Sequence, residues 1–123
     1  MENYILKKNG QLYFKLLSKN KNILFQETNE NALKIWWMYP IVFKNLKLKI
    51  NKIRSHLLKK SIDTRNLFKP LDTMSFLKKY DYQSTGNINS NFLYKNGLYL
   101  PSGLDLTNKQ INYICEEVND LIG

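Results

Sequence analysis

One of only two arginines in the chain, Arg65, stands in the segment with the best prospects for ligand chemistry, residues 63–71. Pro70 pushes the residue before it toward extended geometry, so we expect a stiff, extended stretch that ends in a loop. A planar guanidinium on a stiff element is preorganised to hold an anionic or polyol ligand through paired hydrogen bonds. The residue types leave a second interpretation open, in which Arg65 is a surface side chain paired with a neighbouring Asp.

The other residues with reactive side chains favour structural roles. His56 is the only histidine, and no second histidine or cysteine stands at the spacing of a metal ligand, so we interpret it as a solvated surface residue. Cys115 falls on the apolar stripe of a helix, where a small buried side chain is expected rather than a nucleophile. The sequence contains no glycine-rich phosphate loop and no nucleophile elbow. It therefore predicts no catalytic residue and no metal site.

The net charge of +9 suggests a polyanion-binding surface, but the kind of charge argues against one. Nearly all the positive residues are Lys, whereas paired hydrogen bonds to phosphate favour Arg. Lys, Asn and Ile are together abundant, as an AT-rich genome would encode, so we interpret most of the charge as coding bias. Trp36 and Trp37 could stack on bases, but neighbours on a strand point to opposite faces, and at least one is expected in the core.

The length and composition predict one folded domain over residues 1–123. A chain of 123 residues with 43% apolar side chains can bury one modest core but is too short for two domains. The longest apolar run, residues 35–43, is too short to span a membrane and contains Pro40. A lone cysteine and the lack of a visible secretory signal fit a reducing cytoplasm.

The apolar periodicity predicts helices and strands that would position these residues. We expect helices over residues 4–17, 45–60, 74–80 and 88–97, strands over residues 23–25 and 34–43, and an extended segment over residues 61–68. Gly10 lies inside the first helix at a cost of about 1 kcal/mol relative to Ala, and Pro40 places its strand at an edge or beside a bulge. A glycine-bearing turn is expected over residues 83–87.

The C-terminal helix has the clearest signal. Thr107 and Gln110 form a capping box at its start. The residues that follow at helical spacing form one apolar stripe: Ile111, Ile114, Cys115, Val118, Leu121 and Ile122. The fold class predicted from all these elements is α+β, with a small antiparallel sheet packed against amphipathic helices.

Three motifs follow one another at a spacing that points to a known family. They are Ile35-Trp36-Trp37-Met38-Tyr39, then Thr64-Arg65-Asn66-Leu67-Phe68-Lys69-Pro70-Leu71 after a basic amphipathic helix, and last Gly97-Leu98-Tyr99-Leu100-Pro101-Ser102-Gly103-Leu104-Asp105-Leu106-Thr107. Together they cover nearly the whole chain and resemble the C-terminal small domain of DegT/StrS-type sugar aminotransferases. The resemblance is greatest to perosamine-synthase-like members, which aminate a 4-keto sugar attached to a nucleotide.

The resemblance implies a fold like the small domain of fold-type I aminotransferases. In that family pyridoxal phosphate (PLP) forms a Schiff base with a lysine, an acidic residue pairs with its pyridine nitrogen, and glutamate supplies the amino group. These groups belong to the large N-terminal domain, which is absent here, so we expect this chain alone to bind no PLP and not to be a working enzyme. The small domain supplies one wall of the substrate cleft.

The residues that match this wall are Arg65, Phe68, Pro70 and Asp72, which the resemblance implies as the contacts to a nucleotide sugar. Two positions depart from the family pattern: Asp72 stands where members often have His, and Ser75 where they often have Pro. The implied partner is a large-domain aminotransferase chain or a second copy of this chain. The alternative hypothesis is a non-catalytic basic module that binds nucleic acid or another polyanion through residues 44–60.

Overall fold

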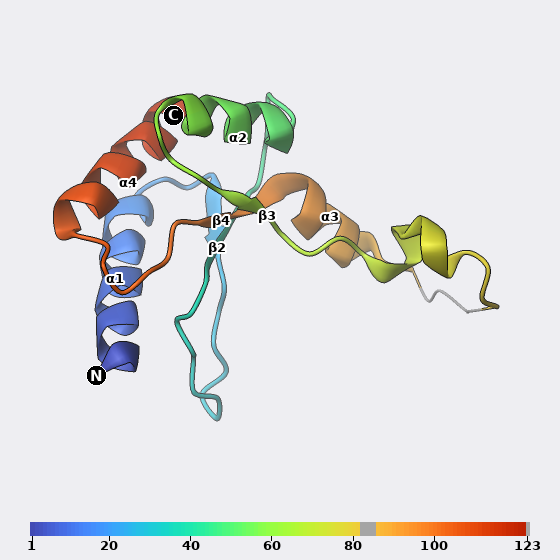
Figure 1. Ribbon diagram of the computed structural model, residues 1–123, viewed down its shortest axis with the longest axis horizontal. Coiled ribbons are helices and arrows are strands. Elements are labelled where there is room, and N and C mark those ends of the chain that lie inside the picture. Colours follow the sequence, from blue (N-terminus) through green and yellow to red (C-terminus); the bar gives the residue numbers. More distant parts are fainter. Residues whose placement is uncertain (82–85, 123) are drawn as a thin grey trace.

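The computed structural model describes residues 1–81 and 86–122, and it confirms the α+β class (Figure 1). The elements in chain order are α1 (Glu2–Leu17), β1 (Ile23–Phe25), β2 (Tyr39–Phe43), α2 (Ile50–Lys59), β3 (Arg65–Asn66), the 3-10 turns η1 (Leu71–Thr73) and η2 (Ser75–Leu77), α3 (Ile88–Asn96), β4 (Gly97–Leu100) and α4 (Asn108–Ile122). Most of the turn predicted over residues 83–87 lies outside the described residues.

The four strands form one antiparallel sheet in the order β1-β2-β4-β3. The interior strand β4 was not predicted, because only four residues separate the end of α3 from the loop at Pro101. Its pairing fixes the register of the sheet, with Tyr39 opposite Leu100 and Arg65 opposite Tyr99.

One face of the sheet holds the hydrophobic core. Alternate residues of the strands point into it, and α1, α2 and α4 cover it; among its fully or nearly buried side chains are Tyr13, Leu17, Tyr39, Ile41, Phe43, Ile53, Leu57, Leu98, Leu100, Ile111, Ile114, Cys115 and Val118. The apolar stripe predicted for the C-terminal helix is therefore confirmed. Burial raises the pKa of the Cys115 thiol to about 12, with the charge of Glu116 adding to the effect, which agrees with an inert core thiol.

Backbone hydrogen bonds fix the start of α4 and the end of α2. The capping box is confirmed: the Thr107 N–H donates to Gln110 Oε1 at 2.8 Å, and the Gln110 N–H donates to Thr107 Oγ1 at 3.2 Å. At the end of α2, Ser61 adopts a left-handed conformation with φ 60, and the Ile62 N–H donates to the Leu57 carbonyl at 2.9 Å. This is the Schellman arrangement, with Ser in the position that glycine usually takes.

The first half of the strand predicted over residues 34–43 is wrong, since the strand begins only at Tyr39. The Trp36 ring instead lies against α1 at Gly10, where a Cβ atom would overlap the ring. Gly10 therefore permits a close approach of helix and ring that Ala would block. Trp36 is partly buried against the core, as expected for at least one of the two tryptophans, and Trp37 is 64% exposed.

Two predicted helices are also corrected. The middle helix begins at Ile50 rather than residue 45, because the Asn22 side chain hydrogen bonds with both the N–H and the carbonyl of Asn45 and holds that residue beside β1. Within the helix predicted over residues 74–80 only the single 3-10 turn η2 forms, and η1 precedes it. The helices predicted over residues 4–17 and 88–97 are confirmed as α1 and α3.

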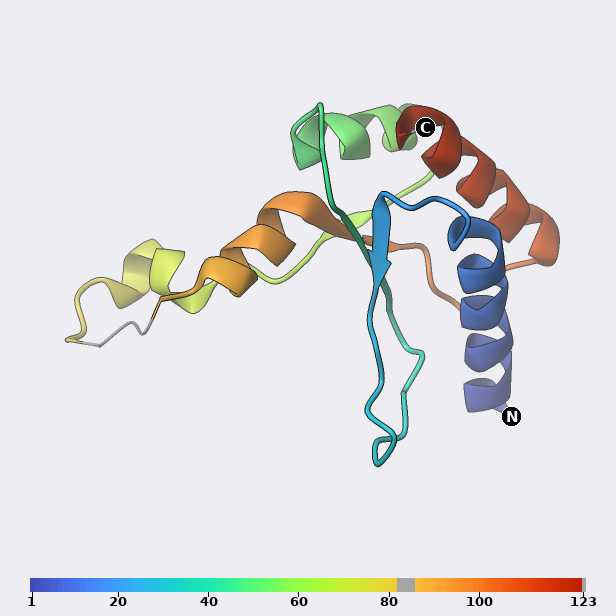
Figure 2. The same ribbon diagram turned by 180° about the vertical axis from the view of Figure 1, so that it is seen from behind.

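Two projections leave the body of the molecule, and both views show them diverging (Figures 1 and 2). One is the long connection between β1 and β2, residues 26–38. The other carries η1, η2 and α3, and it extends away from α1 and α4. The helices therefore leave part of the sheet uncovered. The site described next begins on that part and extends past the end of the sheet to α4.

Candidate functional site

The second face of the sheet presents a row of three side chains. Pro40 on β2 is opposite Tyr99 on β4, and Tyr99 is opposite Arg65 on β3, so the three lie side by side across the strands. They alternate with core residues and therefore point away from the core. Helix α3 contacts β2 and β4 near Gly97, at the other end of this face. Arg65 and Tyr99 are left at the open end.

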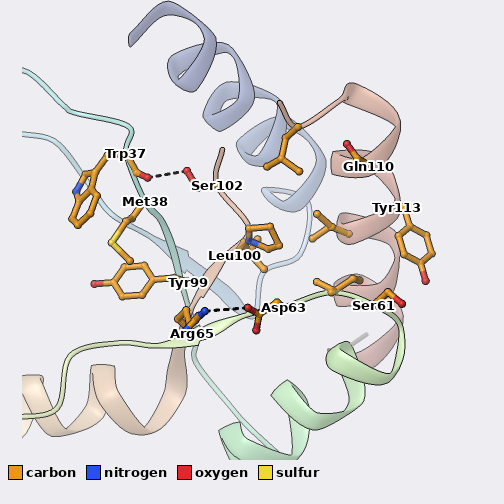
Figure 3. A pocket seen from close by; sticks show the side chains of 14 residues that line it. Trp37, Met38, Ser61, Asp63, Arg65, Tyr99, Leu100, Ser102, Gln110 and Tyr113 are labelled. Carbon is orange, nitrogen blue, oxygen red and sulfur yellow. Dashed lines mark hydrogen bonds and ion pairs between the residues drawn. The ribbon is translucent and has the colours of Figure 1, made fainter. Parts of the chain in front are cut away.

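A hollow of about 650 Å³ begins at this row, where β3 stops pairing with β4 (Figure 3). Arg65, Tyr99, Trp37 and Met38 line one side of it, and Gln110 and Tyr113 of α4 line the other. Ser102 closes the rim near Trp37 by donating from its Oγ to the Trp37 carbonyl at 2.9 Å. The hollow thus combines one guanidinium with the Asp63 carboxylate, three aromatic rings, several hydroxyl groups and the Gln110 amide over an apolar floor. This set suits a polar ligand with a planar or sugar ring.

The structure separates the four residues predicted to contact substrate. Arg65 lines the hollow, and Phe68 packs edge-on against Tyr99, with ring centroids 5.9 Å apart. Pro70 is buried, and Asp72 is half-buried in η1, and neither lines the hollow. The geometry therefore gathers Arg65 and Phe68 around Tyr99, and Pro70 contributes the stiff end of the segment.

Arg65 pairs with Asp63, as in the second interpretation left open by the sequence. Its Nη2 lies 3.3 Å from Asp63 Oδ2, and the two side chains are 76% and 64% exposed. An ion pair this exposed contributes little to stability, about 0–1 kcal/mol, because water screens both charges. The pair therefore leaves the guanidinium free to exchange Asp63 for an anionic ligand.

The second arginine, Arg54, holds the segment that carries Arg65. Its Nε and Nη2 donate to the Thr64 carbonyl at 3.2 and 2.7 Å, and its Nη1 donates to Asn66 Oδ1 at 3.1 Å. The Arg54 guanidinium on α2 thus holds β3 from the core face of the sheet, while Arg65 points to the other face. Sequence reasoning missed this role, and it also missed Tyr99, because both depend on contacts between segments that are separate in the sequence.

His56 was predicted to be a solvated surface residue, and it is exposed on α2. Within residues 1–81 and 86–122, no three His, Cys, Asp or Glu side chains cluster closely enough to hold a metal ion. No helix in the same part of the chain is long and apolar enough to cross a membrane.

The surroundings of Lys34 do not fit a PLP site. Burial lowers the pKa of Lys34, whose Nζ lies 4.4 Å from the Trp36 ring centroid and donates to the Gln26 carbonyl. The hollow of about 410 Å³ beside Lys34 has no carboxylate in its lining. A PLP site needs a lysine together with an acidic partner for the pyridine nitrogen, so these residues do not fit the cofactor.

With this geometry in place, the sheet and its helices can be compared with known structures, and they match part of the fold of aminotransferases. A structure of a DegT/DnrJ/EryC1/StrS aminotransferase from Brucella abortus superposes with a TM-score of 0.81 at 20% identity, over 99% of this chain and 31% of that one. The sugar aminotransferase CalS13 from Micromonospora echinospora gives a TM-score of 0.77 at 17% identity, over 96% of this chain and 30% of that one.

The sequence assigns the family. The profile of the DegT/DnrJ/EryC1/StrS aminotransferase family matches residues 6–119, and the chain belongs to that family. It is 32% identical over 108 residues to the GDP-perosamine synthase of Escherichia coli O157:H7, which is 85% of this chain and 28% of that protein. The chain therefore spans less than a third of the length of these relatives.

Proposed function

We propose that this chain is the small domain of a nucleotide-sugar aminotransferase and forms one wall of a substrate cleft whose catalytic groups lie in a large domain. The observation that supports this most is the open end of the second sheet face, where Arg65 and Tyr99 line one hollow and Phe68 packs on Tyr99. A guanidinium binds the phosphates of a nucleotide sugar, and flat rings pack against its sugar or base.

On this proposal the chain does no chemistry by itself. Its residues bind and orient: Arg65 exchanges Asp63 for a ligand phosphate, and Arg54 keeps β3 in place while it does so. PLP, when bound to a large domain, supplies the electron sink for transamination. The isolated chain should therefore show no visible absorption band with PLP that depends on one particular lysine.

A titration with GDP-sugar and UDP-sugar, with and without a large-domain chain, tests the proposal. Replacing Arg65 by Ala should weaken binding by about 1.5–3 kcal/mol, as for a lost charge-assisted hydrogen bond. Arg65→Lys keeps the charge but loses the paired hydrogen bonds of the guanidinium. Its affinity should lie between those of wild type and Arg65→Ala. Lys59→Ala, an exposed cation on α2, serves as the matched control. Identical titrations for wild type and Arg65→Ala would refute the assignment of this face.

A further inference from the structure

A second hollow lies between α1 and the connection from β1 to β2. Both views place this connection beside α1 (Figures 1 and 2). The hollow has a volume of about 410 Å³ and shares no lining residue with the first hollow, at Arg65. Trp36 and Tyr39 line the second hollow, whereas their neighbours Trp37 and Met38 line the first. The proposed substrate cleft therefore gives the second hollow no role.

Aromatic rings line the second hollow, and contacts within the chain hold them in place. Trp36 lies against α1 at Gly10 and stacks on Tyr39, with ring centroids 6.3 Å apart. Phe14 of α1 and Phe25 of β1 pack edge to face, with ring centroids 5.1 Å apart. All four rings belong to the lining. Because each ring already has a fixed neighbour, little side-chain entropy is lost when a flat ligand packs against it.

The charge that lines the second hollow is positive. Lys7 of α1 and Lys34 of the connection belong to its lining, which contains no Asp or Glu. Lys34 Nζ donates to the Gln26 carbonyl at 3.2 Å and lies 4.4 Å from the Trp36 ring centroid. An ammonium has three N–H donors, and Lys34 has no carboxylate partner in the part of the chain that the structure describes. Lys34 can therefore still donate to an anion bound in the hollow.

Lys34 gains more from a bound anion than an ordinary surface lysine does. Its side chain is half-buried, and burial lowers its pKa because the ammonium has lost part of its hydration. A carboxylate within hydrogen-bond distance replaces that hydration and favours the charged form of the amine. The second hollow should therefore bind an anion more tightly than a neutral ligand of the same shape.

We infer that the second hollow binds a small aromatic carboxylate, whose ring packs against Trp36, Phe14 and Phe25 while Lys34 donates to its carboxylate group. The positive charges of Lys34 and Lys7 repel a cationic ligand, and the aromatic lining favours a flat ring over an aliphatic chain. The volume suits a ligand of one or two rings, because small-molecule sites begin at about 300 Å³. This inference goes beyond the proposed function and uses none of its residues.

The binding experiment titrates the full chain with 2-naphthoate and, as the uncharged counterpart, 2-naphthamide. NMR spectra of the nitrogen-labelled chain follow the indole N–H signals of Trp36 and Trp37, which report on different hollows. Naphthoate should shift the Trp36 signal and bind about tenfold more tightly than naphthamide, as expected for one partly exposed charge-assisted hydrogen bond. Equal affinities for the two ligands, or shifts of the Trp37 signal alone, would overturn the inference.

Two variants separate the contribution of the charge from that of the rings. Lys34→Gln removes the charge and should weaken naphthoate binding about tenfold while leaving naphthamide binding unchanged. Phe14→Ala removes part of the aromatic lining and should weaken the binding of both ligands about fivefold or more. Phe14 is 51% exposed, so the fold should tolerate this change. Lys15→Gln, at an exposed lysine of α1 outside the lining, is the matched control and should bind both ligands as wild type does.

The outcomes also separate this inference from the proposed function. Arg65→Ala should bind naphthoate as wild type does, because Arg65 lines only the first hollow. Naphthoate binding that is weakened by Arg65→Ala but not by Lys34→Gln would place the ligand in the first hollow and overturn the inference. An unchanged Trp36 signal at millimolar naphthoate would overturn it too, since a ligand of this size in a fitting site should reach a Kd of about 1 mM. Neither result would bear on nucleotide-sugar binding at Arg65.

Discussion

The two faces of the sheet differ in what covers them and therefore in what their residues can do. On one face α1, α2 and α4 bury a continuous core that includes Tyr13, Phe43 and Ile111. On the other face α3 covers one end, and Arg65 and Tyr99 remain at the open end beside the hollow. The stability of the domain resides on the first face. The open end of the second face is available for binding, because little of the fold depends on it.

The largest expected effect tests the covered face. Ile114 is 4% exposed and lies in the core cluster. Ile114→Ala should lower the free energy of unfolding by about 2–5 kcal/mol, because a cavity replaces buried methyl groups. Urea denaturation measures this, with Ile88→Ala on the exposed side of α3 as the control. If both variants unfold at the same urea concentration as wild type, the division between the two faces is wrong.

The second prediction concerns the link between the two faces. Arg54→Met keeps much of the stem but removes the hydrogen bonds to the Thr64 carbonyl and Asn66. It should cost about 1.5–3 kcal/mol, the range for hydrogen bonds to a charged group. It should also loosen β3 and so weaken ligand binding at Arg65. Normal β3 protection in hydrogen exchange would show that Arg54 is dispensable.

A gain in stability is expected at the end of α2. Ser61 holds a left-handed conformation, which costs a residue with a side chain about 1–2 kcal/mol relative to glycine. Ser61→Gly should therefore raise the free energy of unfolding by up to about 1 kcal/mol, since glycine also gains entropy in the unfolded chain. Thermal denaturation measures the change. Ser55→Gly, inside α2, is the control and should lower the stability. A loss of stability at both positions would contradict the Schellman assignment.

The sequence predicts the covered face well and the open face poorly, for a physical reason. Long amphipathic stripes such as residues 111–122 carry their own periodic signal, so α4 and its capping box follow from local chemistry. Strand β4 is four residues long and exists because β2 and β3 pair with it. Tyr99 therefore could not be joined to Arg65 before the register was known. Arg65 itself was found because arginine is rare in this chain.

The strand predicted over residues 34–43 begins too early because the aromatic and β-branched residues before Tyr39 are typical of a strand. Residues 34–38 have strand-like side chains, but Trp36 packs on Gly10 of α1 instead of joining the sheet. The contact is between segments far apart in sequence, and only Gly10 inside a helix hinted at it. Of the predicted site residues, Arg65 lines the hollow and Phe68 packs on Tyr99, whereas Pro70 and Asp72 lie away from the hollow. Contacts to substrate from all four residues stay untested.

The smallest expected effect on stability tests the open face. Arg65 and Asp63 form an exposed ion pair, so Asp63→Asn and Arg65→Ala should each change the free energy of unfolding by less than about 1 kcal/mol. Their effects on binding should be opposite in sign. Asp63→Asn removes the carboxylate that competes for the guanidinium and should tighten binding of an anionic ligand, whereas Arg65→Ala weakens it. If the pair is purely structural, the double variant and both single variants will titrate a nucleotide sugar alike and differ only in melting. Opposite shifts in affinity with unchanged melting would show that the second face of the sheet is kept for binding.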